Sequence, residues 1–106
     1  MTDSQAADIE RARILGETAK IPFSELQRWF ASGMAIYVAP DLDLVETAYQ
    51  LSRGNASQLA QWLDSGAVDR VSDAQAADWI ATDALVWAVV VKPWVLVQPV
   101  QPEATH

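Results

Sequence analysis

The stretch LVWAVVVKPWVLVQ, residues 85–98, decides the fold. Valine, leucine and tryptophan dominate it, and apolar residues occupy both sets of alternating positions. This pattern is typical of strands that are covered on both faces. It predicts two strands, at residues 85–91 and 94–98. Lys92 and Pro93 interrupt the run, and they either turn the chain into a hairpin or kink one long edge strand.

A third strand is predicted at residues 34–39, where a short apolar run is closed by Pro40. Apolar residues at helical spacing, together with cap and breaker residues, predict helices in the rest of the chain. These helices are expected at residues 5–20, 22–32, 44–52 (or from 42), 56–65 and 72–81. We therefore expect an α+β fold with about five helices and a small, mainly antiparallel sheet, in a single domain over residues 1–98. Residues 99–106 are expected to form a flexible C-terminal tail.

Two segments of the helical region resemble each other. Residues 57–68 and 74–85 align without gaps, with tryptophan at equivalent positions, Trp62 and Trp79. The likeness indicates either a duplicated helix–turn unit or chance agreement in an alanine-rich sequence. Two copies are too few for a solenoid.

The charge of the chain disfavours polyanionic partners. Its 14 acidic and 7 basic side chains give a formal net charge of −7, and the basic residues are scattered along the sequence. Such a field repels phosphate, so we expect binding neither to nucleic acid nor to an anionic membrane surface.

The amino-acid composition of the chain also argues against several kinds of catalytic site. The chain has no cysteine, and its one histidine is the terminal His106. Thiolate chemistry and the usual Ser–His and Cys–His machinery are therefore not expected. The N-terminus lacks the pattern of a signal peptide, and the apolar stretch 85–100 is too short to span a bilayer, so a cytoplasmic location is expected.

Three segments carry a family resemblance. TAKIPFSELQRWFASG (18–33), DLDLVETA (41–48) and LVWAVVVKPWVLVQ (85–98) are similar to the strongest stretches of a small bacterial family known as domain of unknown function 2288. The likeness covers residues 9–98 in one order without large gaps. It implies a small, stand-alone bacterial protein, and it carries no catalytic residue onto this chain.

The sharpest group of acidic residues is Asp41, Asp43 and Glu46. Oxygen ligands of this kind suit Mg²⁺ or Ca²⁺. The alternative is helix capping, because an aspartate at a helix start accepts backbone N–H bonds and complements the helix dipole. Capping is the interpretation that we favour, and no cofactor or metal is expected.

Aromatic residues suggest two further surfaces, each with a structural alternative. Arg28 and Trp29 form a possible partner surface, or an arginine stem lying over a tryptophan on a solvated face. Trp62 and Trp79 either line a ligand pocket or belong to the core, which is the interpretation we favour.

The apolar strands at the C-terminal end predict self-association. An apolar edge strand is rarely left bare, so a homodimer interface is expected at Trp87, Val89, Val91, Trp94 and Leu96. The alternative is that helices of the same chain cover both faces.

The sequence thus favours a small, acidic, non-catalytic protein that associates with itself. A small-molecule binding or sensing domain with a pocket lined by tryptophan is the alternative, and its ligand is unknown. A carboxylate- and Mg²⁺-dependent enzyme is the third possibility. The biological process is not specified by any residue pattern.

Overall fold

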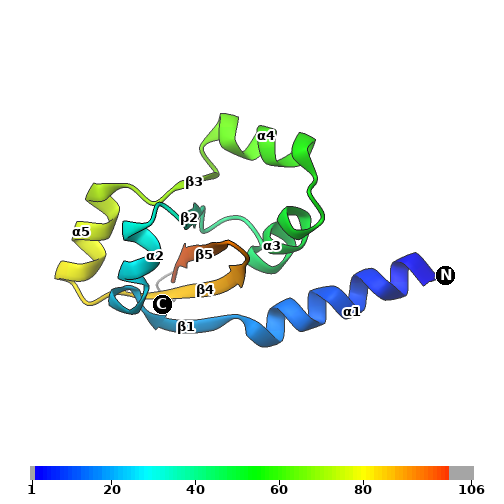
Figure 1. Cartoon of the computed structure of the whole chain (residues 1–106), viewed down its shortest axis with the longest axis horizontal. Helices are drawn as coiled ribbons and strands as arrows, with labels where there is room; N and C mark the ends of the chain where they lie inside the picture. The colour runs from blue at the N-terminus through cyan, green and yellow to red at the C-terminus, as the bar shows by residue number, and fades with distance from the viewer. Residues whose placement is uncertain (1, 101–106) are drawn as a thin grey trace, which may run out of the picture.

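One mixed sheet of five strands organises the molecule, in the order β1-β4-β5-β2-β3 (Figure 1). The computed structural model describes residues 2–100, with side chains from Gln5 onward. β2 and β5 run parallel, and the other three pairs of neighbouring strands are antiparallel. The strands are β1 (Ala19–Pro22), β2 (Ala35–Val38), β3 (Val68–Arg70), β4 (Leu85–Val91) and β5 (Trp94–Pro99). The predicted α+β class and the mainly antiparallel sheet are confirmed.

The last two strands form a hairpin in the middle of the sheet. β4 and β5 pair in an unbroken register from Val91 with Trp94 to Val86 with Pro99. β1 pairs with the other side of β4, and β2 pairs with the other side of β5. The segment is therefore a hairpin, and a further strand pairs with each of its outer sides, at residues 85–88 of β4 and 95–97 of β5.

One helix precedes the first strand, and the others lie in the connections between β1 and β4. They are α1 (Thr2–Glu17), the short 3₁₀ helix η1 (Phe23–Leu26), α2 (Gln27–Ala31), α3 (Leu44–Ser52), α4 (Ala56–Ser65) and α5 (Asp73–Ala81). A capping box formed by Ser72 and Gln75 begins α5, because each side chain accepts a hydrogen bond from the backbone N–H of the other residue. Among the helices within residues 2–100, none is long and apolar enough to cross a membrane.

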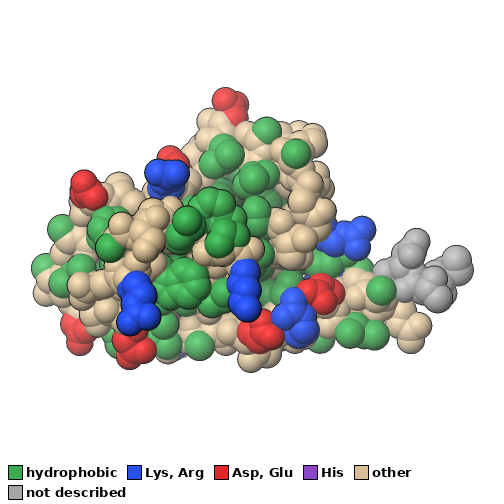
Figure 2. Space-filling view, in the orientation of Figure 1, with side chains coloured by type: hydrophobic (Ala, Val, Ile, Leu, Met, Phe, Trp, Pro, Cys, Tyr) green, Lys and Arg blue, Asp and Glu red, His purple; other side chains and the backbone are tan. Residues whose placement is uncertain are grey.

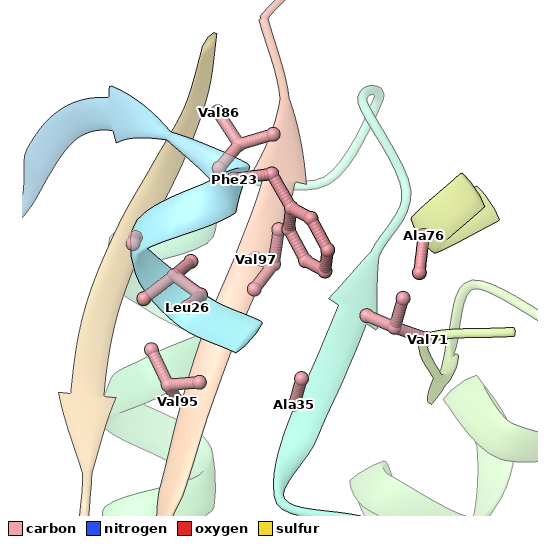
Figure 3. Close-up of a cluster of buried hydrophobic side chains, with 9 residues drawn as sticks. Phe23, Leu26, Ala35, Val71, Ala76, Val86, Val95 and Val97 are labelled. Atoms are coloured by element: carbon pink, nitrogen blue, oxygen red, sulfur yellow. The ribbon is translucent and has the colours of Figure 1, made fainter. Parts of the chain in front are cut away.

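Each face of the sheet carries its own core. On one face Phe23 and Leu26 pack against Val86, Val95 and Val97, with Ala76 of α5 beside them (Figure 3). The ring of Phe23 lies 5.1 Å from that of Trp79 on α5 and 6.2 Å from that of Phe30, measured between centroids. η1, α2 and α5 therefore cover this face.

The opposite face is covered by α1 and α3. Its buried residues include Ile14 of α1, Ala48 and Tyr49 of α3, and Val89 and Leu96 of the hairpin. The N-terminal part of α1 projects beyond the sheet (Figure 1). The chain thus forms three layers, with the hairpin buried between two layers of helix.

The structure adds two strands to the three that the sequence predicts. β1 occupies residues 19–22, where the sequence predicted the end of one helix at residue 20 and the start of the next at residue 22. Pro22 disfavours helical geometry at Ile21, and Ile21 packs against the first core from an extended backbone. β3 has three residues, of which only Val68 is buried, so its alternation is too short to be recognised. Residues 101–106 of the predicted tail lie outside the described residues, and the domain boundary at residue 98 stays a prediction.

The first core yields a stability prediction. Phe23 is fully buried, so Phe23→Ala is expected to lower the free energy of unfolding by about 3–5 kcal/mol, through lost burial and the cavity left behind. Urea denaturation followed by circular dichroism measures the change. Ile9→Ala, a truncation at an exposed site, is the control and should change it by less than about 0.5 kcal/mol. Equal effects of the two substitutions would contradict this description of the core.

Candidate functional site

The acidic residues predicted as possible metal ligands have other roles. Asp43 is the N-cap of α3, and its Oδ1 accepts a hydrogen bond from the backbone N–H of Glu46 at 3.1 Å. Asp41 is exposed in the preceding turn. Within residues 2–100, no group of three or more carboxylate or histidine side chains is arranged to hold a metal ion. The geometry therefore favours capping over a site for Mg²⁺ or Ca²⁺.

Glu46 joins a polar network that links three helices. Its carboxylate accepts hydrogen bonds from Nε of Arg11 at 2.7 Å and from Nε2 of Gln50 at 2.7 Å. Gln50 in turn accepts a hydrogen bond from Nδ2 of Asn55, the N-cap of α4, at 2.8 Å. The guanidinium of Arg11 also lies 4.3 Å from the centre of the Tyr49 ring. This network fastens α1 to α3 and α3 to the start of α4.

The network changes the acidity of Glu46. The hydrogen bond from Arg11, with a second from Gln50, lowers the pKa of Glu46 below its ordinary value of 4.5. Arg11 and Glu46 are 35 positions apart in the sequence, so no periodic pattern could have paired them. The role of this network is positional, because both charges are engaged with each other.

Arg13 is held in a second ionic group on α1. It pairs with Glu10 and, at 3.0 Å, with Glu17, which lie three and four positions away on the same helix. Arg13 and Glu17 also line an open cleft of about 530 Å³ between α1, the end of α3 and the hairpin. Ile14 and Val91 contribute apolar surface there. The cleft has a volume typical of small-molecule sites, but carboxylates already engage its arginine.

The structure separates the predicted aromatic surfaces. Trp29 packs against the first core, so only Arg28 of that pair is exposed. Trp79 contacts Phe23 and belongs to the core, as favoured from the sequence. Trp62 is half-buried on α4. Trp62 and Trp79 lie on different helices, α4 and α5, and neither lines the clefts and cavities described in this section.

The predicted interface residues do not form one surface. Val89 and Leu96 are buried beneath α1 and α3, and Val91 packs against the same core. Trp87 and Trp94 keep part of their surface exposed. The reason is that the hairpin lies inside the sheet, whereas the predicted interface required it to form an apolar edge. That expectation was wrong, and Val89 and Leu96 are core residues in the folded chain.

Trp87 lies instead within a group of exposed apolar side chains that no sequence pattern predicted. Leu15 of α1 is 63% exposed, Leu85 is 49% exposed and Trp87 is 36% exposed. Leu15 and Trp87 line one shallow depression, and Leu85 points to the same side of β4 as Trp87. Nζ of Lys20 lies 5.3 Å from the centre of the Trp87 ring. We call this surface, formed by Leu15, Lys20, Leu85 and Trp87, the Trp87 face.

A second apolar feature lies beneath α4. A cavity of about 190 Å³ is open to solvent there, and its lining consists of aliphatic side chains and the ring of Trp94. Its lining residues are Ile36, Leu51, Leu59, Leu63 and Trp94. Hydrophobic side chains gather on this side of the molecule in Figure 2, between α4 and the hairpin. We call it the α4 cavity.

The capping role of Asp43 can be tested by substitution. Asp43→Asn is expected to leave stability nearly unchanged, because asparagine also caps well, whereas Asp43→Ala should cost about 1 kcal/mol. Urea denaturation measures both. Calorimetric titration of the wild-type protein with Mg²⁺ and with Ca²⁺ is the second readout. A stoichiometric heat that disappears in Asp43→Ala would overturn the capping interpretation.

The pairing of Glu46 with Arg11 predicts a pH dependence. Because the folded pKa of Glu46 is lowered, its contribution to stability is complete at neutral pH and is lost as the pH falls through that pKa. Glu46→Gln should therefore be less stable than the wild type at about pH 7, and the difference should shrink by about pH 3. Both side chains of the pair are 37% exposed, so solvent screening keeps the effect small.

Thermal unfolding across this pH range provides the measurement. Glu25→Gln, at an exposed position on η1, is the control. The difference in stability between this variant and the wild type should not shrink between neutral and acidic pH as it does for Glu46→Gln. A constant difference between wild type and Glu46→Gln at every pH would show that the ion pair is not the cause.

Comparison with known proteins places the chain in a family. The family described as protein of unknown function DUF2288 matches residues 9–99. The solution NMR structure of PA1075 from Pseudomonas aeruginosa is 42% identical and superposes with a TM-score of 0.78, covering 90% of this chain and 88% of that one. Among curated proteins, none matches the chain. The resemblance seen in the sequence is thereby confirmed, and the chain belongs to the DUF2288 family.

Proposed function

We propose that this protein is a non-catalytic interaction domain that associates with a second copy of itself through the Trp87 face. The observation that carries the proposal is the exposure of three large apolar side chains, Leu15, Leu85 and Trp87, on one side of the molecule. Contiguous apolar surface of this kind marks contact sites in soluble proteins. One of the three is Trp87, and tryptophan is a residue type that often anchors protein interfaces.

The charges at the Trp87 face are of both signs, because Lys20 lies beside the Trp87 ring and Asp43 lines the same depression. Each copy carries a formal net charge of −7, so two copies repel each other at a distance. Lys20 contributes a positive charge beside the ring of Trp87 and lessens this repulsion locally. Added salt should therefore strengthen the association by screening the acidic surfaces.

Contact through faces is favoured over pairing of strand edges. The outer strands are β1 and β3, and both are short. β1 carries Lys20 and Pro22, and β3 carries Asp69 and Arg70. Charged residues and proline on short edge strands are devices that discourage edge pairing. A dimer through an apolar edge strand is therefore disfavoured, and contact through the exposed apolar face is favoured.

The location of the protein and the two alternative functions, enzyme and small-molecule binding domain, are taken from the sequence. We place the protein in the bacterial cytoplasm, and its 42% identity to a Pseudomonas aeruginosa protein supports the bacterial source. A carboxylate-dependent enzyme receives less support, because Asp43 and Glu46 are committed to capping and ion pairing. Small-molecule binding retains one specific observation in its favour, the α4 cavity, which is independent of the Trp87 face.

A pair of substitutions on β4 tests the association. Leu85 and Val90 are 49% and 42% exposed and point to opposite faces of the same strand. Leu85→Asp is expected to convert a dimer to a monomer, because it places a charge in the apolar contact, whereas Val90→Asp should leave the dimer intact. Light scattering after size exclusion at tens of micromolar protein measures the mass, and circular dichroism confirms that each variant is folded. A monomeric wild-type protein at this concentration, or equal loss in both variants, would refute the proposal.

A further inference from the structure

The α4 cavity is built by four elements that converge on one point. Ile36 comes from β2, Leu51 from α3, Leu59 and Leu63 from α4, and Trp94 from the start of β5. In Figure 1, α4 lies above the sheet, next to β3, and α3 lies below α4. The cavity is therefore bounded by the sheet on one side and by two helices on the others.

The apolar side of α4 is incompletely covered by the rest of the chain. Leu59, Trp62 and Leu63 share this side of the helix, yet no residue of α4 is fully buried, and Leu63 is 51% exposed. The helix is nevertheless held at its start, because Asn55 caps it and bonds to Gln50 of α3. A fixed amphipathic helix with an unfilled apolar side leaves apolar surface in water, which is unfavourable in proportion to its area.

The lining has little that could retain ordered water. All five side chains are apolar apart from the indole N–H of Trp94. A water molecule in a protein cavity normally needs between two and four polar partners. The same lining offers no charge to compensate a charged ligand. An apolar, uncharged occupant is therefore the chemistry that the cavity favours.

We propose that the α4 cavity binds a small, uncharged, apolar molecule about the size of one aromatic ring. Its volume of about 190 Å³ is of the same order as that of an engineered, enclosed apolar cavity of about 150 Å³ that accepts benzene, although the α4 cavity is open to solvent on one side. It is smaller than the 300 Å³ or more that is typical of drug-sized ligands. A macromolecular interface normally takes about 20–30 residues on each side, whereas five residues line this cavity. The size and the neutral lining thus select a small ligand over a second protein chain.

Titration with toluene, followed by ¹H–¹⁵N and methyl NMR, tests this site in the full chain. Saturable shifts are expected for Trp94, Leu59 and Leu63 as toluene is added. Benzoate, a charged ring of similar size, should bind with an affinity at least about tenfold lower, because its charge would have to be desolvated. The shifts should not depend on protein concentration. Shifts at these residues that grow with protein concentration in the absence of toluene would show that a second copy occupies the cavity, and would overturn the proposal.

Substitutions at the mouth of the cavity provide the control. Leu63→Trp is expected to fill the cavity and abolish the toluene shifts while the fold is retained, because Leu63 is half exposed. Leu63→Ser should weaken binding by about fivefold through loss of apolar contact. Ile80→Ser is the matched control, since Ile80 occupies the equivalent position on α5, is 42% exposed and does not line the cavity. Absence of saturable shifts in the wild type, or unchanged binding in a folded Leu63→Trp, would refute the site.

Discussion

The burial of the β4–β5 hairpin on both faces is the constraint on which the rest of the structure depends. Val86, Val95 and Val97 project to one side, and Val89 and Leu96 project to the other. A hairpin with apolar residues on both sides is stable only if each side is covered. Two separate helical layers meet this requirement, and they fix the three-layer arrangement. Both strands of the hairpin lie inside the sheet, so β1 adds to the outer side of β4, and β2 followed by β3 adds to the outer side of β5.

One polar residue of the hairpin connects it to the charged network on the surface. Gln98 is buried, and its Nε2 donates hydrogen bonds to the backbone oxygens of Ala39 at 2.9 Å and Leu42 at 2.7 Å. These bonds hold the turn that leads to Asp43, where α3 begins. The position of α3 then places Glu46 opposite Arg11 of α1. A buried amide in the sheet thus helps to determine where an ion pair forms between two helices.

The sequence predicted the elements that have strong local signals, and it failed where pairing depends on distant residues. The strands at 34–39, 85–91 and 94–98 and the capped helices were found because alternation, caps and breakers are local. β1 and β3 were missed because each is short and is extended through its partners, β4 and β2. The Trp87 face and the α4 cavity were missed for a related reason. Both combine side chains from separate elements, and no spacing in the sequence brings Leu15 to Trp87 or Leu63 to Trp94.

The internal likeness of residues 57–68 and 74–85 has a structural counterpart. In both segments a helix with a tryptophan in its last turn leads into a strand, and the residue four positions after the tryptophan has a positive φ, 80° at Gly66 and 52° at Asp83. A third segment, from Trp29 to Gly33, ends in the same way, with φ of 74° at Gly33. A positive φ at this point ends a helix and reverses the chain toward the next strand. The three segments therefore use one local solution for passing from helix to strand.

The three helices differ in how much sheet they have to cover, and this difference explains where the apolar cavity arises. α2 and α5 lie against the broad face formed by the hairpin, so Trp29 packs against the first core and Trp79 reaches Phe23. α4 leads instead into β3, an edge strand of three residues in which only Val68 is buried. Such a strand offers little apolar surface for Trp62 and Leu63 to cover. The α4 cavity is therefore the consequence of placing the same helix–strand unit at the short edge of the sheet.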